Sequence, residues 1–305
     1  MNCSRCHNKS VIKLTNSEVS LCEKHFNIYF EKKVRKTIRV YKMVAKQDAI
    51  GVAISGGKDS ISLLYILNKI FKPSKIKLIA VAIDEGIKGY RDPNFSYVKK
   101  FCKKLDIPLK TYSFKNKIGK TLDEIIKKDK KTIPCTYCGV FRRRLLIDAA
   151  LELNVNKLAT GHNLDDEAQS ILMNQFRKNT RASSILGPIT GVKDDKKFVR
   201  RIKPFYFLTE KEVATFAFIN NLLDRYIECP NAILGYRRVV QEMLNDFENK
   251  FPGTKHNIVS SFLSTLPLLK ENFKESSINS CRKCGAATSK NICQTCNFIE
   301  KINSL

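Results

Sequence analysis

The sequence lacks any apolar run long enough to cross a membrane, and it lacks an N-terminal signal peptide. A membrane-spanning helix needs about 20 consecutive apolar residues. The chain opens instead with the polar segment Met-Asn-Cys-Ser-Arg-Cys, which is unlike a secretory leader. We therefore expect a soluble, cytoplasmic protein without membrane contact.

Acidic residues are also scarce. Asp and Glu number 29 against 55 Lys and Arg, which gives a formal net charge of +26. This excess predicts a polyanionic partner, with nucleic acid as the first candidate. A proteome rich in lysine would also produce basic proteins, and charge alone does not separate RNA from DNA. The apolar content of 43% supports a real core, and 305 residues allow one large domain with small modules, or two domains.

The chain contains no Walker A sequence GxxxxGK[ST], but one stretch has an order of strand, turn and helix that is suited to phosphate binding. Residues 49–71 are typical of a buried strand, a turn with the sequence SGGKDS at 55–60, and an amphipathic helix. Gly56 and Gly57 allow the backbone to approach a ligand closely, and Lys58 adds charge beside the helix N-terminus. A turn that merely joins a strand to a helix is the alternative. The six-residue match in this context favours a phosphate-binding loop.

Eleven cysteines in a cytosolic chain indicate metal or redox chemistry more than disulfides. Eight residues form two sets of four, one near each end of the chain, and each set consists of two close pairs separated by a short insert. Four soft ligands in this arrangement suit tetrahedral Zn²⁺. The predicted ligands are Cys3, Cys6, Cys22 and His25 at the N-terminus and Cys281, Cys284, Cys293 and Cys296 at the C-terminus.

Three cysteines remain besides Cys102, which we expect in the core. Cys135 and Cys138 form a Cys-x2-Cys pair at a predicted helix start, followed by the arginines 142–144, and Cys229 precedes a proline as in ferredoxin ligand runs. We expect the helix dipole and the arginines to lower the pKa of the paired thiols. A redox pair, a persulfide carrier and a set of cluster ligands all fit this pattern. The arginines would also suit a phosphate group.

Buried strands alternate with amphipathic helices along the middle of the chain. This alternation predicts an α/β fold with a doubly wound, mostly parallel sheet. Ligands bind at the carboxyl ends of such strands, where Asp84 and His162 are expected, although an acidic turn and a structural histidine are the alternatives. Besides the strand at 49–54, the predicted strands are 76–83, 109–114 and 157–160. The predicted helices are 26–48, 95–105, 121–128, 139–153, 209–223, 239–247 and 258–273. We expect residues 180–204 to be rich in loops, with Arg200 and Arg201 available to an RNA backbone.

Three segments together resemble one family over nearly the whole chain. They are SGGKDS at 55–60, CTYCGVFRRR at 135–144 and GHNLDDEAQ at 161–169, bracketed by two zinc modules. This combination resembles the tRNA 2-thiouridine synthetase family of PP-loop ATP pyrophosphatases. The resemblance implies an N-terminal zinc finger at 1–27, a PP-loop catalytic domain with helical tRNA-contacting parts at 28–275, and a C-terminal zinc ribbon at 276–305.

The central segment, followed by Asp148-Ala149-Ala150, is most similar to the archaeal and eukaryotic branch that modifies the wobble uridine at position 34. Thiolases of position 54 have a similar layout but more often carry lysine where Arg142 stands. Another PP-loop enzyme, such as a lysidine synthetase, is a second alternative, and a non-catalytic zinc-dependent RNA-binding protein is a third.

The resemblance implies a two-step reaction. ATP transfers AMP to the uridine 2-oxygen with release of pyrophosphate, assisted by Mg²⁺, and sulfur then replaces the activated oxygen. Arg142 and Asp165 match residues of the catalytic pocket. The implied phosphate-binding residues are Ser55, Gly57, Lys58, Asp59 and Ser60, and the residues that border the nucleotide are Ala53, Asp84, Gly161 and His162.

The family also implies a [4Fe–4S] cluster on Cys135, Cys138 and Cys229. With three protein ligands, the fourth iron would be open to the transferred sulfur; an active-site persulfide without iron is the rival mechanism. The implied partners are tRNA, a second copy of the chain, and a sulfur donor, which is free sulfide, a persulfide or a sulfur-carrier protein.

Overall fold

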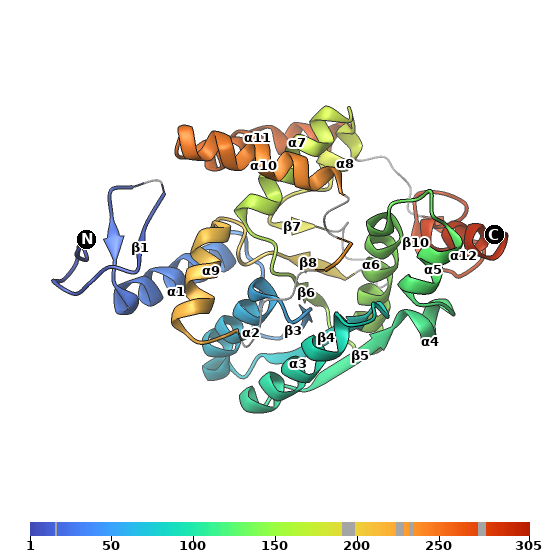
Figure 1. Cartoon of the computed structure of the whole chain (residues 1–305), viewed down its shortest axis with the longest axis horizontal. Helices are drawn as coiled ribbons and strands as arrows, with labels where there is room; N and C mark the ends of the chain where they lie inside the picture. Colours follow the sequence, from blue (N-terminus) through green and yellow to red (C-terminus); the bar gives the residue numbers. More distant parts are fainter. Residues whose placement is uncertain (16, 191–198, 224–228, 232–234, 274–278) are drawn as a thin grey trace.

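The computed structural model describes the chain except residues 16, 191–198, 224–228, 232–234 and 274–278. A six-stranded sheet with the order β5-β4-β3-β6-β8-β7 lies at its centre (Figure 1). All neighbouring strands are parallel except β7, which runs antiparallel to β8. The strands are β3 (Ala49–Ile54), β4 (Lys77–Asp84), β5 (Leu109–Ser113), β6 (Lys157–Ala159), β7 (Ile189–Thr190) and β8 (Arg200–Ile202).

The strand order reverses beside β3. From β3 the chain moves outward through β4 to β5, and it then returns to place β6 on the other side of β3. At such a switch point the connections leave in opposite directions, which opens a crevice at the carboxyl ends of the two strands. The SGGKDS turn follows β3 and the Gly161-His162 pair follows β6, so the topology brings both segments to this crevice. The predicted doubly wound sheet is confirmed.

Helices cover both faces of the sheet because strand β4 is apolar on both faces. Ala80 and Ala82 pack with the helices of one face, whereas Val81 and Ile83 pack with those of the other face. This follows the alternation of side chains along a strand. The first face carries α1 (Glu23–Val40), α2 (Lys58–Phe71), the short 3-10 helix η1 (Lys72–Ser74), α3 (Arg91–Leu105) and α9 (Glu210–Ile219). The second face carries α4 (Phe114–Ile118), α5 (Leu122–Lys128) and α6 (Pro134–Glu152).

Four further helices pack together at the β7 side of the sheet, at the top of Figure 1. Their shared core includes Leu164, Leu244 and Val259. Helix α7 begins at its N-cap Asn163, whose side chain accepts a hydrogen bond from the Asp166 N–H in a capping box. The four helices are α7 (Leu164–Phe176), α8 (Thr180–Ser184), α10 (Tyr236–Lys250) and α11 (Thr254–Asn272).

The two ends of the chain form small modules on opposite sides of the sheet (Figure 1). At the N-terminus, the hairpin of β1 (Ile12–Lys13) and β2 (Ser20–Leu21) leads directly into α1, and the two elements share one core with the central sheet. At the C-terminus, β9 (Asn279–Ser280) and β10 (Ala287–Thr288) pair before α12 (Gln294–Asn303), which packs against α6. The domain limits at 27 and 275 stay predictions.

Most predicted elements lie within a few residues of their expected limits, but the segment 180–204 does not match its prediction. Its described part contains α8, β7 and β8, which we expected to be loop. Strands of two and three residues are too short to show a periodic pattern, so the pairing of β8 with β6 and of β7 with β8 was not visible in the sequence. The prediction of a buried Cys102 is confirmed. Among the described residues, no helix is long and apolar enough to cross a membrane.

Candidate active site

The turn after β3 is closed by its own two serines. Ser60 Oγ accepts a hydrogen bond from the Ser55 N–H at 3.1 Å and donates one to the Gly57 carbonyl at 3.0 Å. Gly56 has φ +91°, in the left-handed region that favours glycine, and Gly57 is the N-cap of α2 without a side-chain cap. The first turn of α2 therefore presents its N–H groups and its positive dipole end toward the crevice, as an anion-binding turn requires.

Gly161, after β6, lies directly against this loop. A Cβ atom at Gly161 would come within 2.9 Å of the Asp59 carbonyl carbon, so only glycine allows this close approach. The next residue, His162, directs Nδ1 to Thr160 Oγ1 at 2.9 Å. The side chain of His162 is partly exposed to solvent, although protein groups surround its ring. Desolvation, followed by the positive charges of Lys203 and Arg237, lowers the pKa of His162 to about 3. The imidazole is therefore neutral near pH 7.

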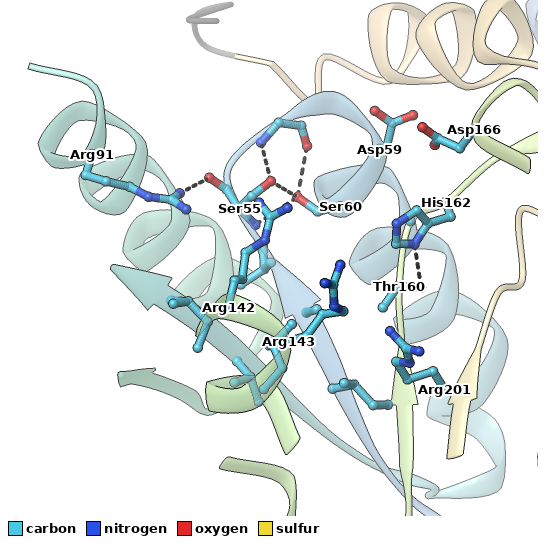
Figure 2. A pocket seen from close by; sticks show the side chains of 18 residues that line it. Ser55, Asp59, Ser60, Arg91, Arg142, Arg143, Thr160, His162, Asp166 and Arg201 are labelled. Atoms are coloured by element: carbon cyan, nitrogen blue, oxygen red, sulfur yellow. Dashed lines mark hydrogen bonds between the residues drawn. The ribbon is translucent and has the colours of Figure 1, made fainter. Parts of the chain in front are cut away.

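These segments surround a cavity of about 470 Å³, shown in Figure 2. This volume lies in the range of pockets that hold a ligand of nucleotide size. Part of the wall is apolar and would suit a nucleobase; it is formed by Ala53, Ile54, Val81, Ile83, Leu146 and Leu158. Four arginines also reach the cavity, namely Arg91 from α3, Arg142 and Arg143 from α6, and Arg201 from β8.

Two carboxylates, Asp59 and Asp166, complete the wall near the loop (Figure 2). Asp59 accepts hydrogen bonds from Asn163 Nδ2 at 3.0 Å and from Lys58 Nζ at 3.1 Å. Burial, opposed by the charge of Arg237 and assisted by the negative charge of Asp59, raises the pKa of Asp166 to about 6. Carboxylate oxygens that repel one another beside a phosphate loop are suitable ligands for Mg²⁺.

Eight of the predicted site residues line this cavity: Ala53, Ser55, Gly57, Asp59, Ser60, Arg142, Gly161 and His162. Lys58 does not, because its Nζ pairs with Asp59 and, at 2.8 Å, with Glu210. Burial lowers the pKa of Lys58, but these two carboxylates outweigh it and raise the pKa above its ordinary value. Gly56 supplies the positive φ of the turn and is not part of the wall.

Two predicted site residues, Asp84 and Asp165, do not line this cavity. Asp84 does not line the cavity, and its carboxylate accepts a hydrogen bond from the Gly86 N–H at 2.8 Å, as in an acidic strand-end turn. Asp165 is buried and faces away from the cavity toward α9 and α11. It accepts hydrogen bonds from the Glu210 N–H at 2.7 Å and from Lys255 Nζ. The adjacent Asp166 takes the place that we predicted for Asp165.

The sequence reasoning did not assign Asp166, Thr160 or Arg91 to the site. The Asn-x-x-Asp spacing at 163–166 was a usable signal, since a capping box fixes its fourth residue at the helix start beside the strand end. Arg91 carried no such signal, because its place depends on the packing of α3 against β4. Arg201, which we expected to be available to an RNA backbone, lies in the wall of the cavity.

Helix α6 brings the cysteine pair close to the same cavity. Cys135 lies in the first turn of α6, and its Sγ donates to the Asn231 carbonyl at 3.5 Å, which brings the segment around Cys229 to the helix start. Cys138 and Cys229 are half-buried against one apolar cluster. Arg142, one turn after Cys138, reaches Glu85 with Nη1 at 3.9 Å and also lines the cavity.

The predicted lowering of the thiol pKa values is wrong. Burial raises the pKa of Cys138 to about 12, and Arg142 offsets only part of this shift. Burial, followed by the charge of Cys229, also raises the pKa of Cys135. The dipole and the arginines do not compensate for removal of a thiolate from water.

Both terminal ligand sets converge as predicted. In each set, all four ligand atoms lie within 4.8 Å of one another. His25 Nδ1 lies 3.4 Å from the sulfurs of Cys3 and Cys22, and the sulfur pair Cys284–Cys293 is 3.6 Å apart. Zn–S bonds of about 2.3 Å require sulfurs about 3.8 Å apart in a tetrahedron, so both sets fit a single zinc ion. The trio of Cys135, Cys138 and Cys229 is not a set of this compactness. A cluster binds each thiolate on a separate iron and therefore does not need sulfurs this close together.

Comparisons with known proteins agree with this geometry. A family model described as the PP-loop domain matches residues 26–238. The tRNA 2-thiolation protein NcsA of Haloferax volcanii is 34% identical, with 100% of each chain covered. The chain belongs to the tRNA 2-thiolation family of PP-loop proteins. The tRNA-5-methyluridine(54) 2-sulfurtransferase of Pyrococcus horikoshii is 37% identical over 98% of this chain and 93% of its own.

A solved member of the family has the same fold. It is the U34-tRNA thiolase NcsA from Methanococcus maripaludis with its [4Fe–4S] cluster, with a TM-score of 0.83 and 32% identity. The match covers 99% of this chain and 96% of that chain. The predicted family and fold class are thereby confirmed, and the terminal modules fall within the matched length. The roles of individual site residues stay predictions.

Proposed function

We propose that this PP-loop protein is a tRNA-uridine 2-sulfurtransferase that converts the wobble uridine at position 34 to 2-thiouridine. One observation carries the proposal: the phosphate loop after β3 and the cysteine-bearing helix α6 line a single cavity of nucleotide size. A reaction that first activates a uridine with ATP and then adds sulfur needs both elements within reach of one nucleotide. The solved U34-tRNA thiolase, which matches nearly the whole chain, supports position 34.

In the first step the uridine 2-oxygen attacks the α-phosphorus of ATP, and pyrophosphate leaves. The N–H groups at the start of α2 and the hydroxyls of Ser55 and Ser60 are placed to hold the phosphates. Lys58 would then exchange part of its contact with Glu210 for the incoming triphosphate. Asp59 and Asp166 would bind Mg²⁺, which neutralises the charge that develops on pyrophosphate.

In the second step sulfur attacks carbon 2 of the adenylated uridine, and AMP leaves with the former 2-oxygen. Cys135, Cys138 and Cys229 would hold a [4Fe–4S] cluster. All three are free thiols, and the contact of Cys135 with Asn231 brings the segment of Cys229 to the start of α6. When bound, such a cluster supplies one iron without a protein ligand. Arg142, between Cys138 and the cavity, is placed to stabilise the departing AMP phosphate.

The two compact terminal sets would each hold one Zn²⁺ and stabilise the small modules around them, as structural zinc does. We also propose that the enzyme acts in the cytoplasm and that it forms a homodimer. Light scattering of the purified protein tests the oligomeric state. The sulfur donor is sulfide, a persulfide or a sulfur-carrier protein. Anaerobic reactions supplied with each donor alone identify it.

The activity test uses anaerobically purified protein, ATP, sulfide and unmodified tRNA transcripts. We expect AMP and pyrophosphate in equal amounts, with 2-thiouridine in the digested tRNA. A transcript with cytidine at position 34 should remain unmodified, whereas one with cytidine at position 54 should react normally; the opposite result would assign the enzyme to position 54. Unchanged adenylation of tRNA without any thiolation, in wild type and Cys135→Ala alike, would favour a lysidine synthetase or a related PP-loop enzyme.

The metal test compares wild type with Cys229→Ala, both prepared without oxygen. We expect about four irons and two zincs per chain in the wild type, and loss of iron with retention of both zincs in the variant. Cys102→Ala, which removes a buried cysteine outside the trio, should keep its iron and serves as the control. Full activity of iron-free wild type would exclude the cluster and leave a persulfide as the sulfur carrier.

A further inference from the structure

Two arginines are shared between the nucleotide cavity and a second cavity. The second cavity, of about 520 Å³, lies between α6, β8 and the C-terminal module, where Ala287 and Thr295 form part of its wall. Arg143 and Arg201 line both spaces. The two cavities are therefore neighbours, and Arg143 and Arg201 lie at their junction.

Among the described residues, no carboxylate neutralises either guanidinium. No ion pair joins a described carboxylate to Arg143 or Arg201, and neither guanidinium donates a hydrogen bond to a described residue. The flanking arginines of α6 differ, since Arg142 faces Glu85 and Arg144 pairs with Asp148 at 2.7 Å. Burial and then mutual repulsion with Arg201 lower the pKa of Arg143. Two unpaired cations held together in a cavity require an anion.

The acid that acts electrostatically on Arg201 is already engaged. Glu167 accepts a hydrogen bond from Lys203 Nζ at 2.6 Å, and both side chains are buried. Figure 2 shows Arg143 and Arg201 reaching the cavity from different elements. The positive charge is therefore directed into the two cavities rather than toward the protein.

The phosphate loop and Arg201 lie on different strands of the sheet. The phosphate loop follows β3, whereas Arg201 lies on β8, with β6 between them. Two strand spacings place these elements about 10 Å apart. On the other side, Arg143 folds back along α6 over Gly139, within electrostatic range of Cys138. The pair thus lies beside the route from the cysteines to the nucleotide cavity.

We propose that Arg143 and Arg201 bind a backbone phosphate of the substrate tRNA next to the target uridine, and that the second cavity receives the adjoining nucleotide. The proposal rests on the tRNA thiolase function proposed above. The uridine must lie between the α-phosphate of ATP and the cysteines, and the phosphate attached to it then falls at the junction of the cavities. Planar guanidinium groups suit a phosphate because each can donate two parallel hydrogen bonds.

The test measures binding of an unmodified tRNA transcript to the anaerobic, metal-loaded full chain at several salt concentrations. Arg143→Gln and Arg201→Gln should each weaken binding about tenfold and reduce the slope of log K against log salt by about one, as expected for one lost phosphate contact. Arg143→Lys keeps the charge and should keep the slope. Arg35→Gln removes one positive charge from an arginine that pairs with Glu31 on α1, and it should change neither quantity.

Binding of a non-hydrolysable ATP analogue is measured on the same proteins and should stay within twofold of wild type. Loss of analogue binding with unchanged tRNA binding would assign the pair to ATP and overturn the proposal. Unchanged binding of both ligands would also overturn it, while 2-thiouridine formation by the wild type would leave the enzyme function intact. If the wild type binds no tRNA and forms no 2-thiouridine, the proposed function fails as well.

Discussion

Arg91 Nη1 donates a hydrogen bond of 3.0 Å to the main-chain oxygen of Ser55 in the phosphate loop. The Nε of the same guanidinium pairs with the buried carboxylate of Glu85, whose other oxygen lies 3.9 Å from Arg142. One carboxylate therefore connects the loop that binds phosphate to the arginine that follows the cysteine pair. These contacts fix the position of the phosphate loop relative to the helix that carries Cys135 and Cys138.

Replacing Arg91 with methionine should destabilise the protein by about 3–5 kcal/mol, because it leaves Glu85 buried without its partner. In the background of Glu85→Gln, the same replacement should cost clearly less. The chain has no tryptophan, so unfolding of the metal-loaded protein by urea is followed by circular dichroism. Equal costs of Arg91→Met in both backgrounds would show that the pair makes no energetic contribution of its own.

Gly161→Ala should lower the rate of ATP-dependent AMP formation about a hundredfold. The new Cβ would lie 2.9 Å from the carbonyl carbon of Asp59, and backbone atoms cannot move aside without displacing the phosphate loop. The matched control is Gly119→Ala. Gly119 has φ +88° and no atom within 4 Å of the added Cβ, so it tests backbone strain alone. Similar activity in the two variants would contradict the close approach.

The features that were predictable from the sequence are those set by short local patterns. The phosphate loop and the two compact ligand sets depend on residues a few positions apart. The sequence could not decide which carboxylate of Asp165 and Asp166 faces the cavity. Adjacent helix positions point about 100° apart, and the packing of α7 against α9 and α11 selects between them.

Electrostatics that depend on burial were predicted least well. The arginines after Cys138 suggested a lowered thiol pKa, but burial has the larger effect and raises it. The three consecutive arginines also proved to have separate surroundings. Arg142 faces Glu85, Arg143 lies between two cavities, and Arg144 reaches Asp148 and the sulfur of Cys284. Their different environments follow from helical geometry and from the docking of the C-terminal module. No local sequence pattern predicts that docking.

The imidazole of His162 should not titrate between about pH 5 and 8, because its pKa is about 3 in the folded protein. The unfolded chain binds a proton near pH 6.5, whereas the folded chain does not. Acidification below that value therefore favours the unfolded state, and stability should rise with pH up to about 6.5. His162→Asn should show a smaller rise in melting temperature over this range.

The direct measurement for His162 is its ring proton shift by NMR, assigned by the signal that disappears in His162→Asn. A titration midpoint near 6.5 would contradict a neutral imidazole beside Lys203 and Arg237. A flat shift means that His162 acts by hydrogen bonding and shape. In that case His162 adds no positive charge to neutralise the bound phosphates.

The C-terminal module should influence the cysteine site, because α12 packs on the helix that carries it. Phe298 contacts Tyr137 edge-on, with ring centroids 4.8 Å apart, and Tyr137 lies between Cys135 and Cys138 in sequence. Lys301 Nζ and Tyr137 OH both donate to Asp129 Oδ2, at 2.8 and 2.6 Å. These contacts fix the first turn of α6 from outside the sheet.

Phe298→Ala should therefore lower the iron content of the anaerobically prepared protein by at least half, while both zincs remain bound. The loss of a partly buried aromatic pair should also cost about 1–3 kcal/mol of stability. Phe218→Ala is the control, since that ring is 79% exposed on α9 and distant from α6 in sequence and in the fold. Iron and zinc are measured together on each protein. Full iron in Phe298→Ala would mean that α6 holds its cysteines without help from the C-terminal module, and simultaneous loss of zinc would show that the substitution had unfolded the module itself.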